Sequence, residues 1–485
     1  MKRNDIVGVD QLVPVLGGRM VCYVNLDNAA TTPPLRAVVD AVGQFLPFAA
    51  SVHRGTGYKS RLSTAAFEDA REAVGHFVGA DQERDVVVFT KNTTEAINQL
   101  ARTLALADDA VVLTTMLEHH SNLLPWRHRA TTVCIRARLD GSLDEDDLDA
   151  QLARYGNRVA LLAVTGASNV TGVVPPIHRL AGKVHAVGGA ILVDAAQLAG
   201  HRPIDMLAHD DPGHLDVIAL SAHKLYAPYG SGALVGDRQL LDVDPEPRGG
   251  GTVRAVTRTD VVWADLPDRA EAGSPNLLGA IAFAAATRRL SAVGLSTIAD
   301  HEQQLATYAR TRLAELPEVK VFGASRAELG VISFTVARSD PRLVAAVLGY
   351  EHGIGVRSGC FCAQPYVHHL LGLDGVAVER WVGEARRGDL RAAPGLVRIS
   401  LGCYNDRGDV DRAVEALRCV VTGDIGGTYR QQLDGSFVPI EWDRDSSATA
   451  APTAKRGATS ARHRRRRDWH VAAPGRFIPT WRSPL

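Results

Sequence analysis

Short apolar runs alternate with helix-like stretches from Val24 to about Leu290, and this alternation limits the possible folds more than any other feature of the chain. Strands buried between two layers of helices appear as brief, nearly continuous apolar runs. Two helices are expected, each opening on a hydroxyl residue with an acidic residue soon after it, at Ser63–Val78 and Thr94–Leu106. The clearest strands are Val86–Phe89, Ala160–Val164, Ala190–Val193 and Val217–Leu220. Residues 24–290 are therefore predicted to form an α/β domain on a large, mostly parallel sheet.

A second pattern follows from 291 to 422 and predicts a smaller α+β domain. Its expected elements are a helix at Thr297–Leu316, a strand at Gly330–Val336, a helix at Pro341–Leu348, a strand and Gly-rich turn at Gly353–Cys362, a strand at Leu396–Leu401 and a helix at Asp409–Val420. The polar stretch 372–394 fits no clear element and is interpreted as a surface insertion. Residues 1–23 form a separate N-terminal segment in this scheme.

The chain from 423 to 485 differs in composition from the rest. Residues 446–485 are dominated by Ala, Ser, Thr, Pro, Gly and Arg without apolar periodicity, which indicates a disordered tail. Lys455–Leu485 holds nine Lys or Arg and one Asp, a formal charge of +8. Such a tail can bind nucleic acid weakly or another acidic partner, while a solvated segment without a dedicated ligand is the simpler interpretation.

Composition narrows the cellular setting. The whole chain carries a formal net charge of zero, so nothing global favours nucleic-acid or membrane binding. Six scattered cysteines in 485 residues do not form a disulfide framework, which favours a reducing compartment. The N-terminus lacks the apolar stretch of a signal peptide, and no window reaches the roughly 18 to 20 apolar residues of a membrane helix. A cytoplasmic, non-membrane protein is expected.

A lysine and a carboxylate follow two of the predicted strands. Lys224, in the sequence SAHK, comes directly after the apolar run that ends at Leu220. Burial at a strand end lowers a lysine pKa and makes the amine a Schiff-base nucleophile, although a surface lysine there is commoner. Asp194 ends the earlier strand AILVD and is suited to pair with a protonated pyridine nitrogen, with Gln197 near the ring's phenolic oxygen. Taken alone, Asp194 is better explained as a helix cap.

Two further motifs suit a phosphorylated aromatic cofactor. Thr93 and Thr94 stand where a strand meets a helix, and the positive helix end there attracts phosphate. Ser221 and His223, beside the lysine, are further phosphate donors. His119 offers an imidazole that can stack on a ring. The adjacent His120 raises the alternative of a metal site, but neighbouring histidines point in different directions and no other ligands accompany them.

Together, the order and spacing of these motifs resemble class V of the fold-type I pyridoxal-5'-phosphate (PLP) enzymes, in the cysteine desulfurase and selenocysteine lyase branch. The resemblance covers about Val24 to Val421. It also includes LDNAATTPP at Leu26–Pro34, SVHRG at Ser51–Gly55, ASNVTG at Ala167–Gly172, GGGT at Gly249–Thr252, EAGSPN at Glu271–Asn276 and RSGCFCAQP at Arg357–Pro365.

The resemblance implies a role for each matching residue. Lys224 is the Schiff-base lysine, Asp194 the pyridinium partner and His119 the stacking histidine. Arg398 holds the substrate carboxylate, assisted by Arg357. The other cofactor positions are Gln197, Asn169, Thr93, Thr94, Ser221, His223 and Ser274. Ser274 stands where related enzymes commonly have Thr, at a position through which the neighbouring subunit completes the phosphate site, so the family pattern implies a homodimer.

Cys362 matches the mobile-loop cysteine that attacks sulfur on the substrate. Three features depart from the family pattern. Cys360 stands where His or another residue is usual, and residues two apart on an extended turn face the same side, so Cys360 is placed to accept the sulfur. The HRGxH motif ends here in Gly57, without its second histidine. The stretch before Arg398 is also longer than expected, and these differences leave room for a changed substrate.

The resemblance therefore implies a PLP-dependent enzyme that removes sulfur from L-cysteine, leaves alanine and a persulfide on Cys362, and passes the sulfur to an acceptor protein. The enzyme alternative keeps the cofactor but performs transamination, elimination or epimerisation on another small amino acid. The non-enzyme alternative is a scaffold of the same fold that binds partners through its basic tail. The joint presence of Lys224, Asp194, His119 and Arg398 argues against a scaffold.

Overall fold

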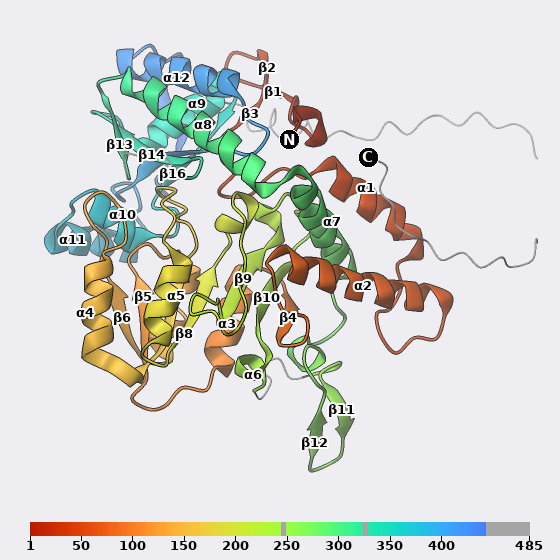
Figure 1. Ribbon diagram of the computed structural model, residues 1–485. Helices are drawn as coiled ribbons and strands as arrows, with labels where there is room; N and C mark the ends of the chain where they lie inside the picture. The colour runs from red at the N-terminus through yellow and green to blue at the C-terminus, as the bar shows by residue number, and fades with distance from the viewer. Residues whose placement is uncertain (244–248, 324–327, 443–485) are drawn as a thin grey trace, which may run out of the picture. The chain divides into compact units, whose positions relative to one another are not determined.

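The computed structural model describes residues 1–243, 249–323 and 328–442 of the 485-residue chain. Met1–Glu441 form one compact unit, shown in Figure 1. The second unit, Trp442–Leu485, lies outside the described residues apart from Trp442, and with it most of the predicted basic tail.

The centre of the compact unit is the predicted large sheet, which has seven strands in the order β4-β10-β9-β8-β7-β5-β6. Only β10 runs antiparallel, to both β4 and β9. The four strands predicted from sequence lie within β4, β7, β8 and β9, so the α/β prediction is confirmed. The bounds are β4 Asp85–Thr90, β5 Val111–Thr115, β6 Thr131–Ile135, β7 Val159–Thr165, β8 Ala190–Asp194, β9 Val217–Ser221 and β10 Gly232–Asp237.

Helices bury both faces of this sheet, which explains the continuous apolar runs. Neighbouring residues of β7 divide between two cores, because successive strand side chains point to opposite faces. Leu161 packs with α3 (Thr93–Thr103) and the buried Trp126, whereas Leu162 packs with residues of α4 and α5. The other large-domain helices are α1 Arg36–Phe45, α2 Tyr58–Phe77, α4 Glu145–Tyr155, α5 Ile177–His185, α6 Arg238–Leu241 and α7 Leu277–Val293.

Two helix starts differ from the sequence prediction. The second helix, α2, begins at Tyr58 with Gly57 as its N-cap, so Ser63 lies inside the helix and is not the predicted cap. Its hydroxyl accepts a hydrogen bond from the N–H of Ala50. Helix α3 begins at Thr93, and the side chain of Asn92 accepts from the N–H of Glu95, so Asn92 caps this helix. Propensity locates such helices more reliably than their first residue.

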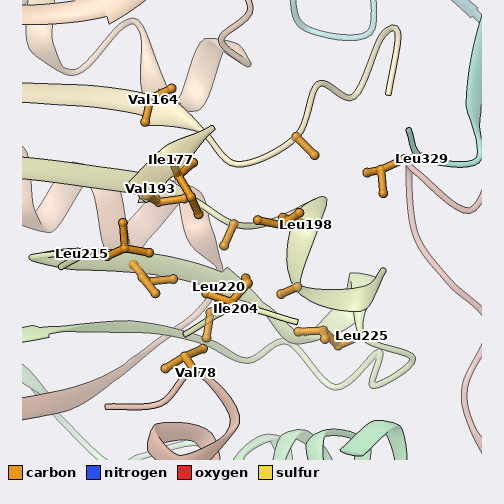
Figure 2. Packing of buried hydrophobic residues seen from close by; sticks show 14 of the residues in the cluster. Val78, Val164, Ile177, Val193, Leu198, Ile204, Leu215, Leu220, Leu225 and Leu329 are labelled. Carbon is orange, nitrogen blue, oxygen red and sulfur yellow. The ribbon is translucent and has the colours of Figure 1, made fainter. Parts of the chain in front are cut away.

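Apolar side chains next to the site residues hold the strand ends in place. Figure 2 shows Val164, Val193 and Leu220 of three neighbouring strands in one buried cluster. The same cluster contains Leu198, directly after Gln197, and Leu225, directly after Lys224. The polar residues at this edge of the sheet are therefore flanked in sequence by buried anchors.

The smaller α+β domain is built on a four-stranded antiparallel sheet in the order β13-β14-β17-β16. Its predicted elements are present, except that Gly353–Cys362 divides into two short strands. The first, β15, pairs in parallel with β3 near the N-terminus. The bounds are β3 Val24–Asn25, β13 Val319–Phe322, β14 Val331–Val336, β15 Ile354–Gly355, β16 Arg357–Gly359, β17 Leu396–Ser400, α8 Leu295–Ala314, α9 Pro341–His352, α10 Gln364–Leu370 and α12 Arg407–Thr422.

Several segments left unassigned by the sequence have regular structure. The polar stretch 372–394 contains α11 (Gly375–Arg386), a helix without fully buried residues. Past Gly423, where the tail was expected to begin, the hairpin of β18 (Tyr429–Gln431) and β19 (Phe437–Pro439) attaches to α9 through a Tyr429–Glu351 hydrogen bond of 2.8 Å. Two more hairpins join β1 (Leu12–Pro14) to β2 (Met20–Cys22) and β11 (Val253–Val256) to β12 (Val261–Trp263); the second projects from the large domain in Figure 1.

No single helix of the described residues has both the length and the apolar character to cross a membrane. The pair α7 and α8, bent by 75° at their junction, meets that test of length and composition only jointly.

A buried ion pair fixes the segment 268–276 against the large domain. Arg71 of α2 donates to Glu271 at 2.7 and 3.1 Å, and Glu271 also accepts from the N–H of Phe89. Both side chains are about 10% exposed. Burial raises the pKa of Glu271, and the Arg71 pairing opposes that effect.

Substitution of Glu271 by Gln should lower the free energy of unfolding by about 3 kcal/mol, because it leaves the buried Arg71 charge less compensated. The midpoint of urea unfolding measures this. Asp265→Asn removes the partner of Arg254 from an exposed ion pair and is the matched control, with no measurable change expected. Equal effects of the two substitutions would contradict the assignment.

Candidate active site

A cavity of about 330 Å³ lies at the carboxyl-terminal edge of the parallel strands. Its volume falls in the range of small-molecule sites. Twelve of the thirteen residues singled out from the sequence line it, and Ser274 does not. The twelve are Thr93, Thr94, His119, Asn169, Asp194, Gln197, Ser221, His223, Lys224, Arg357, Cys362 and Arg398.

Lys224 and Asp194 come from neighbouring strands. Asp194 is the last residue of β8, and Lys224 ends the short 3-10 helix Ala222–Lys224 that follows β9. Because β8 and β9 are parallel partners, both side chains emerge at the same edge. Burial lowers the pKa of Lys224 to about 8; Asp194 opposes this shift and Arg398 adds to it. Burial raises the pKa of Asp194, whose carboxylate accepts from the N–H of Ala196 at 3.0 Å.

Hydroxyl and N–H donors gather at the N-terminus of α3. The backbone N–H of Thr93 donates to Ser221 Oγ at 2.8 Å, and Ser221 Oγ lies 2.9 Å from Thr93 Oγ1. Thr94 Oγ1 lies 2.7 Å from Ser121 Oγ. The positive end of α3 adds to the attraction of these groups for an anion. Burial and the nearby Lys224 charge lower the pKa of His223 to about 4, so its ring is neutral at physiological pH.

His119 presents an uncharged ring to the cavity. Burial, followed by the charges of Lys224, His120 and Arg398, lowers its pKa to about 3. Its Nδ1 accepts from the N–H of Ser121 at 3.1 Å. The neighbouring His120 turns elsewhere, and its Nε2 accepts from the N–H of Gln364 at 3.2 Å. The two histidines therefore do not converge on one ligand.

Two arginines and one acid form the cationic wall. Arg357 of β16 and Arg398 of β17 are directly paired across the small sheet. Asp27 bridges them, at 2.9 Å from Arg357 and 3.0 Å from Arg398. Arg398 also donates to the carbonyl of Asn169 at 2.9 Å. Burial lowers the pKa of Arg398.

The cysteine turn has an unusual backbone. Phe361 and Cys362 both have left-handed conformations, with φ of 53° and 56°. Two hydrogen bonds of 2.7 Å hold this geometry: Asn169 donates to the carbonyl of Phe361, and the N–H of His120 donates to the carbonyl of Cys362. The Cys362 side chain is exposed at the cavity wall. Strained backbone of this kind persists only where its surroundings hold it.

The expectation that Cys360 faces the same side as Cys362 is wrong. The turn is not extended at residues 361 and 362, so the rule for alternate residues of a strand does not apply. The Cys360 thiol contacts the carbonyl of Pro394 at 3.0 Å, and Cys360 does not line the cavity. Burial raises its pKa to about 11, which disfavours the thiolate.

Sequence reasoning missed eight of the twenty residues that line the cavity, Ser121 and Phe361 among them, and it also missed Asp27 behind the arginines. Ser121 lines the cavity beside Thr94 and His119, Phe361 lies 4.7 Å from the Arg398 guanidinium, and Asp27 bridges the arginines. Asp27 and Phe361 stand inside the motifs LDNAATTPP and RSGCFCAQP, so the motifs located both residues without indicating what they contact.

Comparisons with known proteins agree with this geometry. Residues 24–413 match the family model "Aminotransferase class-V". A cysteine desulfurase of Haloferax volcanii is 35% identical over 81% of this chain and 88% of its own, and one of Dickeya dadantii is 37% identical over 83% and 92%. Among solved structures, the apo cysteine desulfurase of Thermococcus onnurineus NA1 is similar with a TM-score of 0.73 and 32% identity, covering 83% of this chain and 95% of that one.

The two-domain architecture and the lysine-bearing cavity define a fold-type I enzyme of the PLP-dependent class. The chain belongs to the class-V aminotransferase family, and within that family it is cysteine desulfurase-like.

The buried amine should titrate as a separate group. After removal of any cofactor, Lys224 should react with an amine reagent half-maximally near pH 8, as its lowered pKa requires. Lys183 should react only at higher pH, because its pairing with Asp149 and Glu145 outweighs burial and raises its pKa. Peptide mass spectrometry across a pH series measures both.

The charges of Asp194 and Arg398 shift the pKa of Lys224 in opposite directions, so substituting each residue provides a second test. Asp194→Asn removes a charge that raises the pKa of Lys224, so the midpoint should move to lower pH. Arg398→Gln removes a charge that lowers this pKa, so the midpoint should move to higher pH. Shifts in the opposite directions would show that other groups control the lysine.

Proposed function

We propose that this enzyme removes sulfur from L-cysteine, giving alanine and a persulfide on Cys362. The observation that carries the proposal is the exposed Cys362 thiol on the wall of the cavity that also holds Lys224 and Arg398. The relatives with the same fold bear the name cysteine desulfurase, and this supports the same substrate here.

The side chains of the cavity suit three groups of PLP: the phosphate, the ring nitrogen and the aldehyde. A phosphate suits the donors of Thr93, Thr94, Ser221 and His223, which are neutral and adjoin a helix N-terminus. A protonated ring nitrogen suits the buried Asp194 carboxylate, and an aldehyde suits the amine of Lys224. His119 would cover the ring, with Gln197 and Asn169 near its phenolic oxygen. Buried Gln197 Oε1 and Arg398 Nε have no hydrogen-bond partner among the described residues, so polar capacity remains on the lining.

The arginines supply the substrate's anchor. The planar guanidinium of Arg398 suits a carboxylate, and its rigid contacts to Asn169 and Asp27 fix its orientation before any ligand arrives. Arg357, half exposed, extends the cationic wall toward solvent. This placement directs the amino group of a small amino acid into the cavity, toward the buried Lys224.

In the sulfur-transfer step, the substrate sulfur passes from its carbon atom to the sulfur of Cys362. When bound, PLP would supply an electron sink that makes the bonds of the amino acid easier to break. The Cys362 thiolate forms a bond to the substrate sulfur while the substrate's carbon–sulfur bond breaks, and the electron pair stays on carbon. That carbon takes up a proton to become the methyl group of alanine. Lys224, with a pKa of about 8, is suited to move protons near neutral pH.

The proposal extends to the oligomeric state of the enzyme, its cellular compartment and the acceptor of the sulfur. Ser274 lies in a second cavity with Lys91, Gly230 and Asn276, away from the other phosphate donors. We assign it to the phosphate site of a partner subunit in a homodimer. All six cysteines are unpaired, which supports a reducing, cytoplasmic setting in which an acceptor protein receives the sulfur.

The two thiols separate the proposal from its alternatives. Cys362→Ser should retain the cofactor's visible absorbance and lose persulfide formation, because a hydroxyl is a far poorer nucleophile toward sulfur. Cys360→Ser, the matched control two residues away, should stay active, since its half-buried thiol contacts the carbonyl of Pro394. Mass spectrometry after one turnover with cysteine locates the added sulfur. A label on Cys360, or full turnover by Cys362→Ser, would overturn the assignment of the nucleophile.

The lysine assignment has its own test. Borohydride reduction of the cofactor-loaded enzyme, followed by peptide mapping, should place the cofactor on Lys224, and Lys224→Ala should lose turnover because it removes the only lysine that lines the cavity within the described residues. A cofactor found on another lysine would reject the assignment.

If Ser274 completes the phosphate site of a partner subunit, cofactor affinity should depend on its hydroxyl group and on assembly of the dimer. Ser274→Ala should raise the dissociation constant of the cofactor roughly 5- to 10-fold through loss of one hydrogen bond, and Ser274→Thr should preserve it. Cofactor titration and light scattering measure affinity and assembly together. A monomer with full cofactor affinity would refute the assignment.

A further inference from the structure

A buried cluster of two histidines and one aspartate lies at the opposite end of the large sheet from the active site. Asp85 opens β4, and its register partner Asp237 closes β10. His209 and His214 come from the loop that precedes β9. Strand β4 runs six residues from Asp85 to Thr90 at the active-site end, a span of about 17 Å. The cluster is therefore separate from the catalytic cavity.

His214 carries the observation that points to a ligand. The residue is 3% exposed, and its Nδ1 lies 3.0 Å from the carbonyl of Leu207. This contact places the proton on Nδ1 and leaves a lone pair on Nε2. That Nε2 is buried and has no hydrogen-bond partner among the described residues. An unpaired buried nitrogen is costly, so it requires an explanation.

The neighbouring groups are oriented in the way that metal ligands usually are. His209 Nε2 lies 3.0 Å from Asp85 Oδ1, and His209 Nδ1 lies 3.5 Å from Asp237 Oδ2. Metal-binding histidines commonly donate their second N–H to a carboxylate or a carbonyl, which here are Asp237 and Leu207. The other oxygen of Asp85 accepts from the N–H of Asp81 at 2.8 Å.

We propose that Asp85, His209 and His214 bind one divalent transition-metal ion, with Zn²⁺ as the ion best suited to two imidazoles and one carboxylate. The three ligand atoms lie within 4.8 Å of one another. Ligands of a tetrahedral zinc ion stand about 3.3 Å apart, so the His209–Asp85 pair is close to that spacing and His214 completes the site by a small rotation. A water takes the fourth position.

The metal accounts for every polar atom of the cluster with one arrangement of protons. His214 donates through Nδ1 and coordinates through Nε2, and His209 coordinates through Nε2 with its Nδ1 3.5 Å from Asp237. Asp85 coordinates through Oδ1 and accepts through Oδ2. A hydrogen-bond network alone leaves Nε2 of His214 unpaired. The two histidine rings already lie together, with their centroids 4.0 Å apart and their planes inclined by 32°.

The loop that carries the histidines is firmly held at both ends. Ile204 and Leu215 are buried in the same cluster as Val78, as Figure 2 shows. The ion would therefore join this loop to the first residue of β4. The proposed site is structural, and the metal ion takes no part in the reaction at the active site.

Zinc affinity of the full-length holoenzyme tests the proposal. All variants are made in a Cys134→Ser, Cys362→Ser background, so that the two exposed thiols do not bind the probe ion. His214→Gln retains a polar side chain but removes the imidazole, and it should weaken Zn²⁺ binding at least 100-fold in competition with a chromophoric chelator. Asp237→Asn, which acts through His209, should weaken binding about 10- to 100-fold. Zinc should raise the melting temperature of the background protein and not that of His214→Gln.

His178→Gln is the matched control. His178 contacts the same loop through the carbonyl of Gly213 at 2.8 Å but does not face the cluster. The His178→Gln protein should therefore bind Zn²⁺ with unchanged affinity. If His214→Gln fails to fold, Asp237→Asn decides, because Asp237 is partly exposed and outside the three ligands. Equal Zn²⁺ affinity in all variants, or no binding by the background protein at micromolar free Zn²⁺, would overturn the proposal.

Discussion

The burial of the Lys224 amine is the constraint on which the rest of the active site depends. Removing an ammonium from water disfavours its charge, and this lowers the pKa of Lys224 to about 8 despite the nearby Asp194 carboxylate. The same desolvation keeps His119 and His223 neutral. One low-dielectric cavity thus produces a reactive amine, an uncharged aromatic ring and donors suited to an anion. The apolar anchors Leu198 and Leu225 hold that cavity in shape.

The cavity is assembled from segments far apart in the sequence. The large domain supplies the lysine and the acid, whereas Arg357 and Arg398 come from the small sheet, and Asp27 follows the N-terminal strand β3. Arg398 links all three through its contacts to Asn169 and Asp27. Under the proposed function, substrate binding would therefore require correct placement of the small domain, because a shift of one ångström changes how well reacting groups are oriented.

The sequence allowed much of this arrangement to be predicted, and its limits have physical causes. Residues at strand ends, such as Asp194 and Lys224, could be located because buried parallel strands give a strong apolar signal. The α2 start and the direction of Cys360 could not, since both depend on tertiary contacts at Ser63 and Pro394. The cluster around His209 was invisible for the same reason, as this residue is 124 positions from Asp85.

The bridge that Asp27 makes between Arg357 and Arg398 changes the nature of substrate capture. In the proposed function, a substrate carboxylate would not meet bare guanidinium groups, because the resident carboxylate of Asp27 already pairs with both arginines. In substrate binding, the substrate carboxylate would then replace the Asp27 carboxylate at guanidinium groups that the fold has already desolvated and oriented. Ligands without a carboxylate gain nothing from such an exchange. Under the proposed function, Asp27 would therefore compete with the substrate carboxylate for the two arginines, and uncharged thiols would be disfavoured.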